Sequence, residues 1–123
     1  MSVVCGSDLR LNDYPFDLEA AHIKWHAYDG PDEVANGLAL CGFHHNSFDR
    51  GVWVLKAQHS DLVVHVSDGL RGRSSAINLL RDFQDCPIYL PETNEYHPDQ
   101  QYVRWHQDYF GFGNSLIEIP QEI

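Results

Sequence analysis

The chain has 123 residues, of which 43% are hydrophobic, and this size and composition are typical of one compact domain. Its 18 acidic and 8 basic side chains give a formal net charge of -10, which argues against a broad surface that grips phosphates. That charge still allows a site that works with a divalent cation and a few local Lys or Arg side chains. There is no apolar run of about 18 residues and no signal-peptide pattern, so we expect a cytoplasmic domain that contacts no membrane.

The first half of the chain predicts a strand and a helix separated by loops. Residues 1–17 are rich in turn signals and are expected to form a loop or knuckle that folds around a metal. Residues 18–23 predict a short strand, and the polar stretch 29–32 predicts an exposed loop. Residues 40–50 predict a short helix, with Gly51 where a C-terminal cap is expected.

The second half predicts a hairpin, two helices and one weak strand. In chain order these are a hairpin at 52–55 and 61–67, a helix at 73–83, a strand at 88–90, and a final helix opened by Pro98-Asp99 that carries Tyr102, Val103, His106 and Tyr109. The sequence has no internal repeat and no linker that would split it. The expected fold class is therefore α+β, in a single domain spanning 1–123.

Four side chains between residues 18 and 51 can supply the parts of a phosphodiester hydrolase, which needs a base, a cation and rigid positioning. His22, at the end of the predicted strand, has a side chain suited to take a proton from water. His45 and Asp49 lie four apart on the predicted helix, so they share a face and can hold one cation. Asn36 lies in the loop between them, where its amide can orient the loop and His22.

Each of these residues also has an ordinary structural interpretation. A single histidine is more often a surface or core residue than a catalytic one. Asp49 can be an exposed residue near a helix end, although a carboxylate there opposes the helix dipole and so favours a bound cation. The order of the whole set, rather than any one member, carries the hypothesis.

The order and spacing of these residues resemble the HNH endonuclease family. The resemblance rests on Leu18-Glu19-Ala20-Ala21-His22-Ile23, Asn36-Gly37-Leu38-Ala39-Leu40-Cys41, His44-His45 and Phe48-Asp49-Arg50-Gly51. It implies a ββα-metal finger that holds one divalent cation against the scissile phosphate. It also implies that His22 is the general base, that Asn36 and His45 are the other two motif residues, and that Asp49 is a metal ligand.

Two further segments, Ile23-Lys24-Trp25-His26 and Val103-Arg104-Trp105-His106, resemble the C-terminal nuclease domain of modification-dependent restriction enzymes, notably those recognising phosphorothioated DNA. This implies a DNA substrate and a separate DNA-recognition domain or subunit. The finger would be the core at 18–51, followed by an additional hairpin and C-terminal helices in an extension at 61–112 and a loose tail at 113–123. Mg²⁺, Mn²⁺, Ni²⁺ and Co²⁺ all stay open as the cation.

The chain departs from the family pattern at two places. Where many members have an Asp or His ligand directly before the general base, this chain has Ala21, so water or substrate oxygens would complete the coordination. Where many members have two Cys-x-x-Cys pairs for structural zinc, this chain offers Cys5, Cys41 and His44, and Ser2 occupies the remaining place. Cys5 and Cys41 can equally be small buried thiols.

The basic residues and the acidic charge leave two functions to weigh. Lys24, Arg50, Arg71 and Arg73 are candidates for contacts with DNA, although a solvated helix face explains the last two slightly better. We expect a metal-dependent DNA endonuclease that serves as the cleavage module of a restriction or defence system. The alternative is a catalytically weak or inactive module that binds nucleic acid or protein together with a partner. The oligomeric state stays open.

Overall fold

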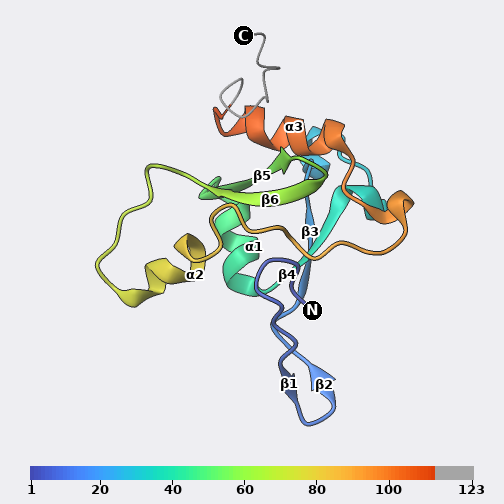
Figure 1. The fold of residues 1–123 in the computed structure, drawn as a ribbon. Coiled ribbons are helices and arrows are strands. Elements are labelled where there is room, and N and C mark those ends of the chain that lie inside the picture. The colour runs from blue at the N-terminus through green and yellow to red at the C-terminus, as the bar shows by residue number, and fades with distance from the viewer. Residues whose placement is uncertain (113–123) are drawn as a thin grey trace.

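The computed structural model describes residues 1–112, in which two strands and a short helix form the centre of the molecule (Figure 1). The strands form three antiparallel pairs, and the elements confirm the expected α+β class with a ββα unit. The elements are β1 (Arg10–Leu11), β2 (Tyr14–Pro15), β3 (Glu19–His22), β4 (Gly37–Leu40), α1 (Gly42–Asp49), β5 (Trp53–Gln58), β6 (Asp61–Val66), α2 (Asn78–Arg81) and α3 (Gln100–Tyr109), with single 3-10 turns at His26–Tyr28, Val34–Asn36, Ser75–Ile77 and Asn94–Tyr96.

The N-terminal 17 residues form a tight turn followed by a small hairpin, where the sequence predicted only a loop or knuckle. The turn is closed by the amide of Gly6, which donates to the carbonyl of Ser2 over 2.8 Å. The hairpin pairs β1 with β2 and projects away from the rest of the molecule (Figure 1). Strands of two residues leave too little pattern in a sequence for a prediction.

The ββα unit consists of β3, β4 and α1. β3 pairs with β4 from Glu19 opposite Leu40 to His22 opposite Gly37. The prediction of a helix from residue 40 was wrong at its start, because Leu40 belongs to β4 and α1 begins at Gly42. Cys41 ends the strand and caps the helix, since its Sγ accepts from the amide of His44.

The helix α1 ends as predicted at a glycine. Gly51 has a φ of +70°, a backbone conformation that side chains with a Cβ rarely adopt. Its amide donates to the carbonyl of Phe48 over 3.1 Å. A Cβ at this position would also lie 2.3 Å from the ring of Phe110, so the residue after α3 packs directly on the end of α1.

The predicted second hairpin is confirmed as β5 and β6, which pair from Trp53 opposite Val66 to Gln58 opposite Asp61. α3 lies across this hairpin (Figure 1). The predicted final helix is also confirmed; Asp99 caps it by accepting from the amide of Gln101 over 2.9 Å. The core lies between α1, the β3–β4 and β5–β6 pairs and α3, and its largest fully buried side chains include Phe48, Trp53, Ile23, Leu40 and Leu55.

Two predicted elements of the second half were wrong. The helix at 73–83 is reduced to α2 and the 3-10 turn before it, because Ser74 caps that turn and only Leu80 of α2 is buried. The strand at 88–90 is absent from the described residues; the amide of Ile88 donates to Leu62 and the neighbouring Pro87 makes an isolated bridge to Val63. The predicted tail at 113–123 lies outside the described residues. None of the helices within 1–112 has the length and apolar character needed to cross a membrane.

Candidate functional site

Asn36 fastens the loop that joins β3 to β4. It is 1% exposed, and its amide group bonds only to backbone atoms. Its Oδ1 accepts from the amide of Lys24 over 2.7 Å, and its Nδ2 donates to the carbonyls of Lys24 and Pro31, each over 2.9 Å. A buried amide satisfied in this way holds both ends of the loop beside His22. This is the position and the kind of contact that the sequence predicted for Asn36.

His22 lies at the end of β3 with its side chain 40% exposed. Its Nε2 lies 2.6 Å from Oδ1 of Asp32, which comes from the loop that Asn36 fastens. The hydrogen bond from His22, followed by its charge, lowers the pKa of the Asp32 carboxyl. A carboxylate that accepts from one ring nitrogen leaves the other ring nitrogen to accept a proton, as a general base requires.

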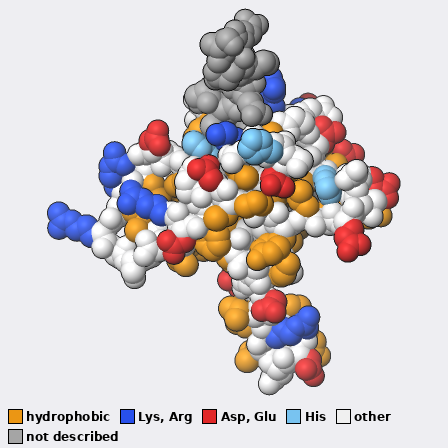
Figure 2. Space-filling model, in the orientation of Figure 1, with side chains coloured by type: hydrophobic (Ala, Val, Ile, Leu, Met, Phe, Trp, Pro, Cys, Tyr) orange, Lys and Arg blue, Asp and Glu red, His pale blue; other side chains and the backbone are white. Residues whose placement is uncertain are grey.

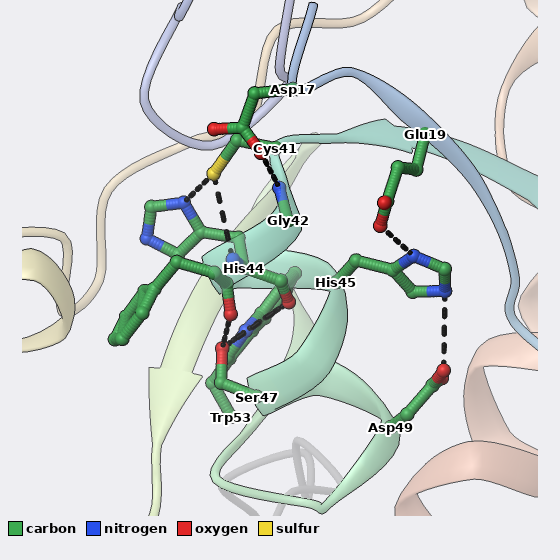
Figure 3. Close-up of polar contacts among 10 residues, drawn as sticks. Asp17, Glu19, Cys41, Gly42, His44, His45, Ser47, Asp49 and Trp53 are labelled. Atoms are coloured by element: carbon green, nitrogen blue, oxygen red, sulfur yellow. Dashed lines mark hydrogen bonds and ion pairs between the residues drawn. The ribbon is translucent and has the colours of Figure 1, made fainter.

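His45 and Asp49 lie one turn apart on α1, as predicted, and face one another (Figure 3). Nε2 of His45 lies 3.1 Å from Oδ2 of Asp49. On the other side of the ring, Nδ1 lies 2.7 Å from Oε1 of Glu19, a residue of β3. These three side chains line an open pocket of about 630 Å³ together with Gly42, Asn46 and Arg50.

The carboxyl of Asp49 lies in a partly buried environment. Burial raises its pKa, while the charge of His45 opposes the rise. The indole of Trp25 and the charge of His22 also act to lower it. The buried Trp25 nitrogen has no partner at hydrogen-bonding distance, so its effect on Asp49 is that of a nearby dipole. A partly buried carboxylate that gains from added positive charge is a suitable ligand for a cation.

The structure brings His22 and His45 to neighbouring places but not into contact. His22 lines a second pocket, with Asp32 and Asn36, that does not include His45. The charge of His22 nevertheless acts on the Asp49 carboxyl and opposes the rise of its pKa. The candidate base and the candidate cation ligands therefore line two separate pockets of the ββα unit.

A second group of metal-binding side chains forms around the N-terminal turn. Ligand atoms of Cys5, Cys41 and His44 all lie within 4.8 Å of one another. Nδ1 of His44 lies 3.1 Å from Sγ of Cys41, while its Nε2 lies 2.7 Å from the carbonyl of Leu79 (Figure 3 shows the Cys41 side). Because that carbonyl can only accept, Nε2 carries the proton and Nδ1 presents its lone pair to the two sulfurs.

This group is largely buried: Cys41 and His44 are buried and Cys5 is partly buried. Burial lowers the pKa of His44 and raises the pKa of the Cys41 thiol, with the neighbouring Cys5 adding to the latter effect. Ser2 is fully buried beside them. Its hydroxyl makes no hydrogen bond, although it lies close enough to lower the pKa of Cys41. A buried hydroxyl without a partner is costly, so Ser2 lacks a compensating contact beside this group of ligands.

The predicted DNA-contacting residues fall into two regions. Arg50 lines the pocket of His45 and Asp49, and Lys24 lies in the loop held by Asn36. Arg71 and Arg73 belong to the segment between β6 and α2, and this segment runs on the opposite side of α1 from β3 (Figure 1). Figure 2 shows Lys and Arg side chains projecting from that side of the molecule. The structure therefore separates Arg71 and Arg73 from the pocket.

Sequence reasoning missed two residues of the site, Glu19 and Asp32. Glu19 lies three residues before His22, in the segment 18–23 that resembles the family. Its proximity to His45 follows only from the pairing of β3 with β4 and the path of α1. Asp32 belongs to the polar stretch read as an exposed loop, and it is indeed 78% exposed. An acidic residue ten positions after the proposed base was the available signal for it.

Comparison with known proteins adds two findings. Residues 2–56 match the family model of the HNH endonucleases. A solved structure described as a modification dependent TagI restriction endonuclease is similar in fold, with a TM-score of 0.62 and 23% sequence identity over 98% of this chain. The chain spans 35% of the length of that structure's chain. No curated protein matches this sequence.

Proposed function

Because residues 2–56 match the family model of the HNH endonucleases, we propose that the chain is a metal-dependent DNA endonuclease that hydrolyses phosphodiester bonds. The observation that carries this proposal is the pairing of His45 and Asp49 in an open pocket beside the strand and loop that hold His22 and Asn36. We further propose that it is the cleavage module of a restriction or defence system, in keeping with its structural neighbour.

The residues of the pocket fit a divalent cation. His45 and Asp49 would hold it, and a cation bound there supplies positive charge that stabilises the charge developing on the phosphate. One imidazole and one carboxylate suit Mn²⁺, Co²⁺ and Ni²⁺ better than Mg²⁺, which prefers oxygen ligands. The partial burial of the Asp49 carboxyl supports this assignment, because a nearby cation relieves the cost of burying its charge.

The proton transfer falls to His22. Its ring accepts a proton from the attacking water while Asp32 holds the ring and stabilises the imidazolium that forms. Asn36 touches neither substrate nor cation in this proposal. It keeps the loop of Asp32 and the end of β3 in fixed positions through its three backbone hydrogen bonds.

Nicking of supercoiled plasmid tests these roles. The assay compares wild type with His22→Ala and His45→Ala in Mg²⁺, Mn²⁺, Co²⁺ and Ni²⁺, and uses His59→Asn in the β5–β6 turn as a matched histidine control. Loss of a general base is expected to slow nicking by about 10²- to 10⁴-fold. Equal nicking by all four proteins would contradict the assignment. DNA binding without cleavage in any of these ions would favour a non-catalytic binding module.

Recognition of a particular DNA is proposed to reside in another domain or subunit. A net charge of -10 gives the chain little general attraction for DNA, so contacts from Arg50 at the pocket and from Lys24 in the loop held by Asn36 would be local. Arg71 and Arg73 would contact DNA only where it passes the other side of α1. We expect the isolated chain to cut plain and phosphorothioated plasmids weakly and without sequence preference. Strong site-specific cutting by this chain alone would contradict the proposal.

We also propose that Cys5, Cys41 and His44 hold a structural zinc ion. The orientation of His44 by Leu79 and the unpartnered hydroxyl of Ser2 support it, and zinc bound there would tie the N-terminal turn to the start of α1. The test is the zinc content of purified protein, with Cys5→Ser as the variant and Cys86→Ser, outside the group, as the control. We expect Cys5→Ser alone to lose zinc. Equal zinc in all three proteins would refute the site.

A further inference from the structure

The imidazole of His45 lies between two carboxylates, those of Glu19 and Asp49. Oε1 of Glu19 lies 2.7 Å from Nδ1, and Oδ2 of Asp49 lies 3.1 Å from Nε2 (Figure 3). The His45 side chain is 25% exposed, less than either carboxylate. The ring is therefore held from β3 on one side and from its own helix on the other.

The two contacts cannot both be hydrogen bonds of a neutral ring. A neutral imidazole has one N–H, so it donates to one carboxylate and presents a lone pair to the other. The 2.7 Å contact with Glu19 has the length of a hydrogen bond to a charged acceptor. With the proton on Nδ1, the lone pair of Nε2 faces the carboxylate of Asp49. The lone pair and the carboxylate repel one another, and a cation bound by both atoms removes that repulsion.

The distances distinguish the two sides of the ring. Two neighbouring ligand atoms of a six-coordinate cation with bonds of about 2.1 Å lie about 3.0 Å apart. The 3.1 Å between Nε2 and Asp49 matches that separation. The 2.7 Å between Nδ1 and Glu19 is shorter and has the length of a charge-assisted hydrogen bond. Asp49 is thus on the cation side of the ring, and Glu19 is on the proton side.

We infer that Glu19 is a positioning residue that fixes His45 with its proton on Nδ1, so that Nε2 and Asp49 together receive the cation. This inference rests on the proposed function. It also bears on Ala21, where the strand lacks a ligand. Glu19, two residues earlier, supplies a carboxylate that acts on the ligand rather than on the ion. Such outer carboxylates orient metal-binding histidines and typically strengthen metal binding about 10- to 100-fold.

The first test observes the proton directly in the metal-free protein. Two-bond ¹⁵N–¹H NMR spectra of ¹⁵N-histidine-labelled protein, at about pH 8.5 where ordinary imidazoles are neutral, report which ring nitrogen is protonated. His45→Ala identifies the signals of His45. We expect the proton on Nδ1 in wild type and in Glu19→Gln, whose amide oxygen still accepts. In Glu19→Ala we expect it to move to Nε2 and face Asp49.

The second test measures binding of Mn²⁺ alone by isothermal titration calorimetry. Glu19→Ala is expected to weaken Mn²⁺ binding about 10- to 100-fold, and Glu19→Gln to restore affinity to within a few-fold of wild type. Asp61→Asn removes one exposed negative charge from the β5–β6 hairpin and serves as the charge-matched control. It is expected to bind as wild type does. Thermal melting of all variants confirms that each is folded.

The outcomes separate this inference from the proposed function. An unchanged tautomer in Glu19→Ala overturns the role of Glu19, whatever happens to metal binding. A changed tautomer with unchanged Mn²⁺ affinity overturns the claim that the tautomer serves the cation. Mn²⁺ binding that survives His45→Ala shows that the cation lies elsewhere, which defeats the proposed cation site itself. A changed tautomer, weakened binding and rescue by Glu19→Gln support the inference.

Discussion

Protonation of His106 is expected to destabilise the protein as the pH falls. His106 is 1% exposed and stacks on Phe48 of α1 at 3.8 Å between ring centroids. Its Nε2 donates to the carbonyl of Phe48 over 2.9 Å, whereas its buried Nδ1 has no partner. Burial lowers its pKa from 6.5 to about 4, since an imidazolium there would lose its hydration.

The size and the pH range of the effect follow from that pKa. Between pH 6.5 and about 4 the unfolded chain binds a proton at His106 that the folded protein does not. The free energy of unfolding therefore decreases as the pH is lowered through this range. The difference in the pKa of His106 between the unfolded and folded states corresponds to about 3 kcal/mol of stability. This stability is fully present above pH 6.5 and is lost as the pH falls towards 4. This is a large part of the free energy of unfolding of an ordinary domain, about 5–15 kcal/mol.

Urea unfolding at several pH values measures this effect, with His106→Gln as the comparison. Glutamine does not titrate and its amide can still donate to Phe48, while other groups titrate equally in both proteins. Between pH 7 and pH 4 the stability difference between wild type and variant is expected to change by about 3 kcal/mol, or roughly 1–3 M in urea midpoint. A difference that stays constant across this range would refute the argument.

Two further predictions concern the loop beside His22. Asn36→Asp is expected to lower stability by more than about 2 kcal/mol and to slow nicking, because a carboxylate cannot donate to the carbonyls of Lys24 and Pro31; urea unfolding and the plasmid assay measure both effects, and an unchanged midpoint would contradict this. Gly30→Ala is expected to prevent stable folding, since its Cβ would lie 1.8 Å from the carbonyl oxygen of Lys24. Gly111→Ala, with nothing within 4 Å, should lower the melting temperature only slightly by comparison, and similar losses in both would contradict the steric argument.

The sequence predicted those parts of the fold whose signals are local. The caps at Gly51 and Asp99 and the β-branched run of β5 and β6 identify their elements without any long-range information. β4 was missed because Gly37–Leu40 has only four residues and ends where the helix pattern begins. The helix at 73–83 was overpredicted because too few of its side chains find a core to bury them.

In the candidate site too, the sequence predicted the contact within one element and missed the contacts between elements. His45 and Asp49 share a face of one helix, so their spacing alone brings them together, and the structure places them 3.1 Å apart. Glu19 reaches His45 from a different element, 26 residues away, and such a contact depends on strand register and helix direction. Asp32 reaches His22 through the fold of a loop that Asn36 holds, and no periodicity in the sequence describes that loop.

The most direct test of the central claim is a crystal structure of the protein soaked in Mn²⁺, with anomalous diffraction used to locate the ion. We expect an anomalous peak bound by Nε2 of His45 and a carboxylate oxygen of Asp49, and we expect no such peak in His45→Ala. A peak bound elsewhere, or no peak at His45 and Asp49 at Mn²⁺ concentrations that support nicking, would contradict the account.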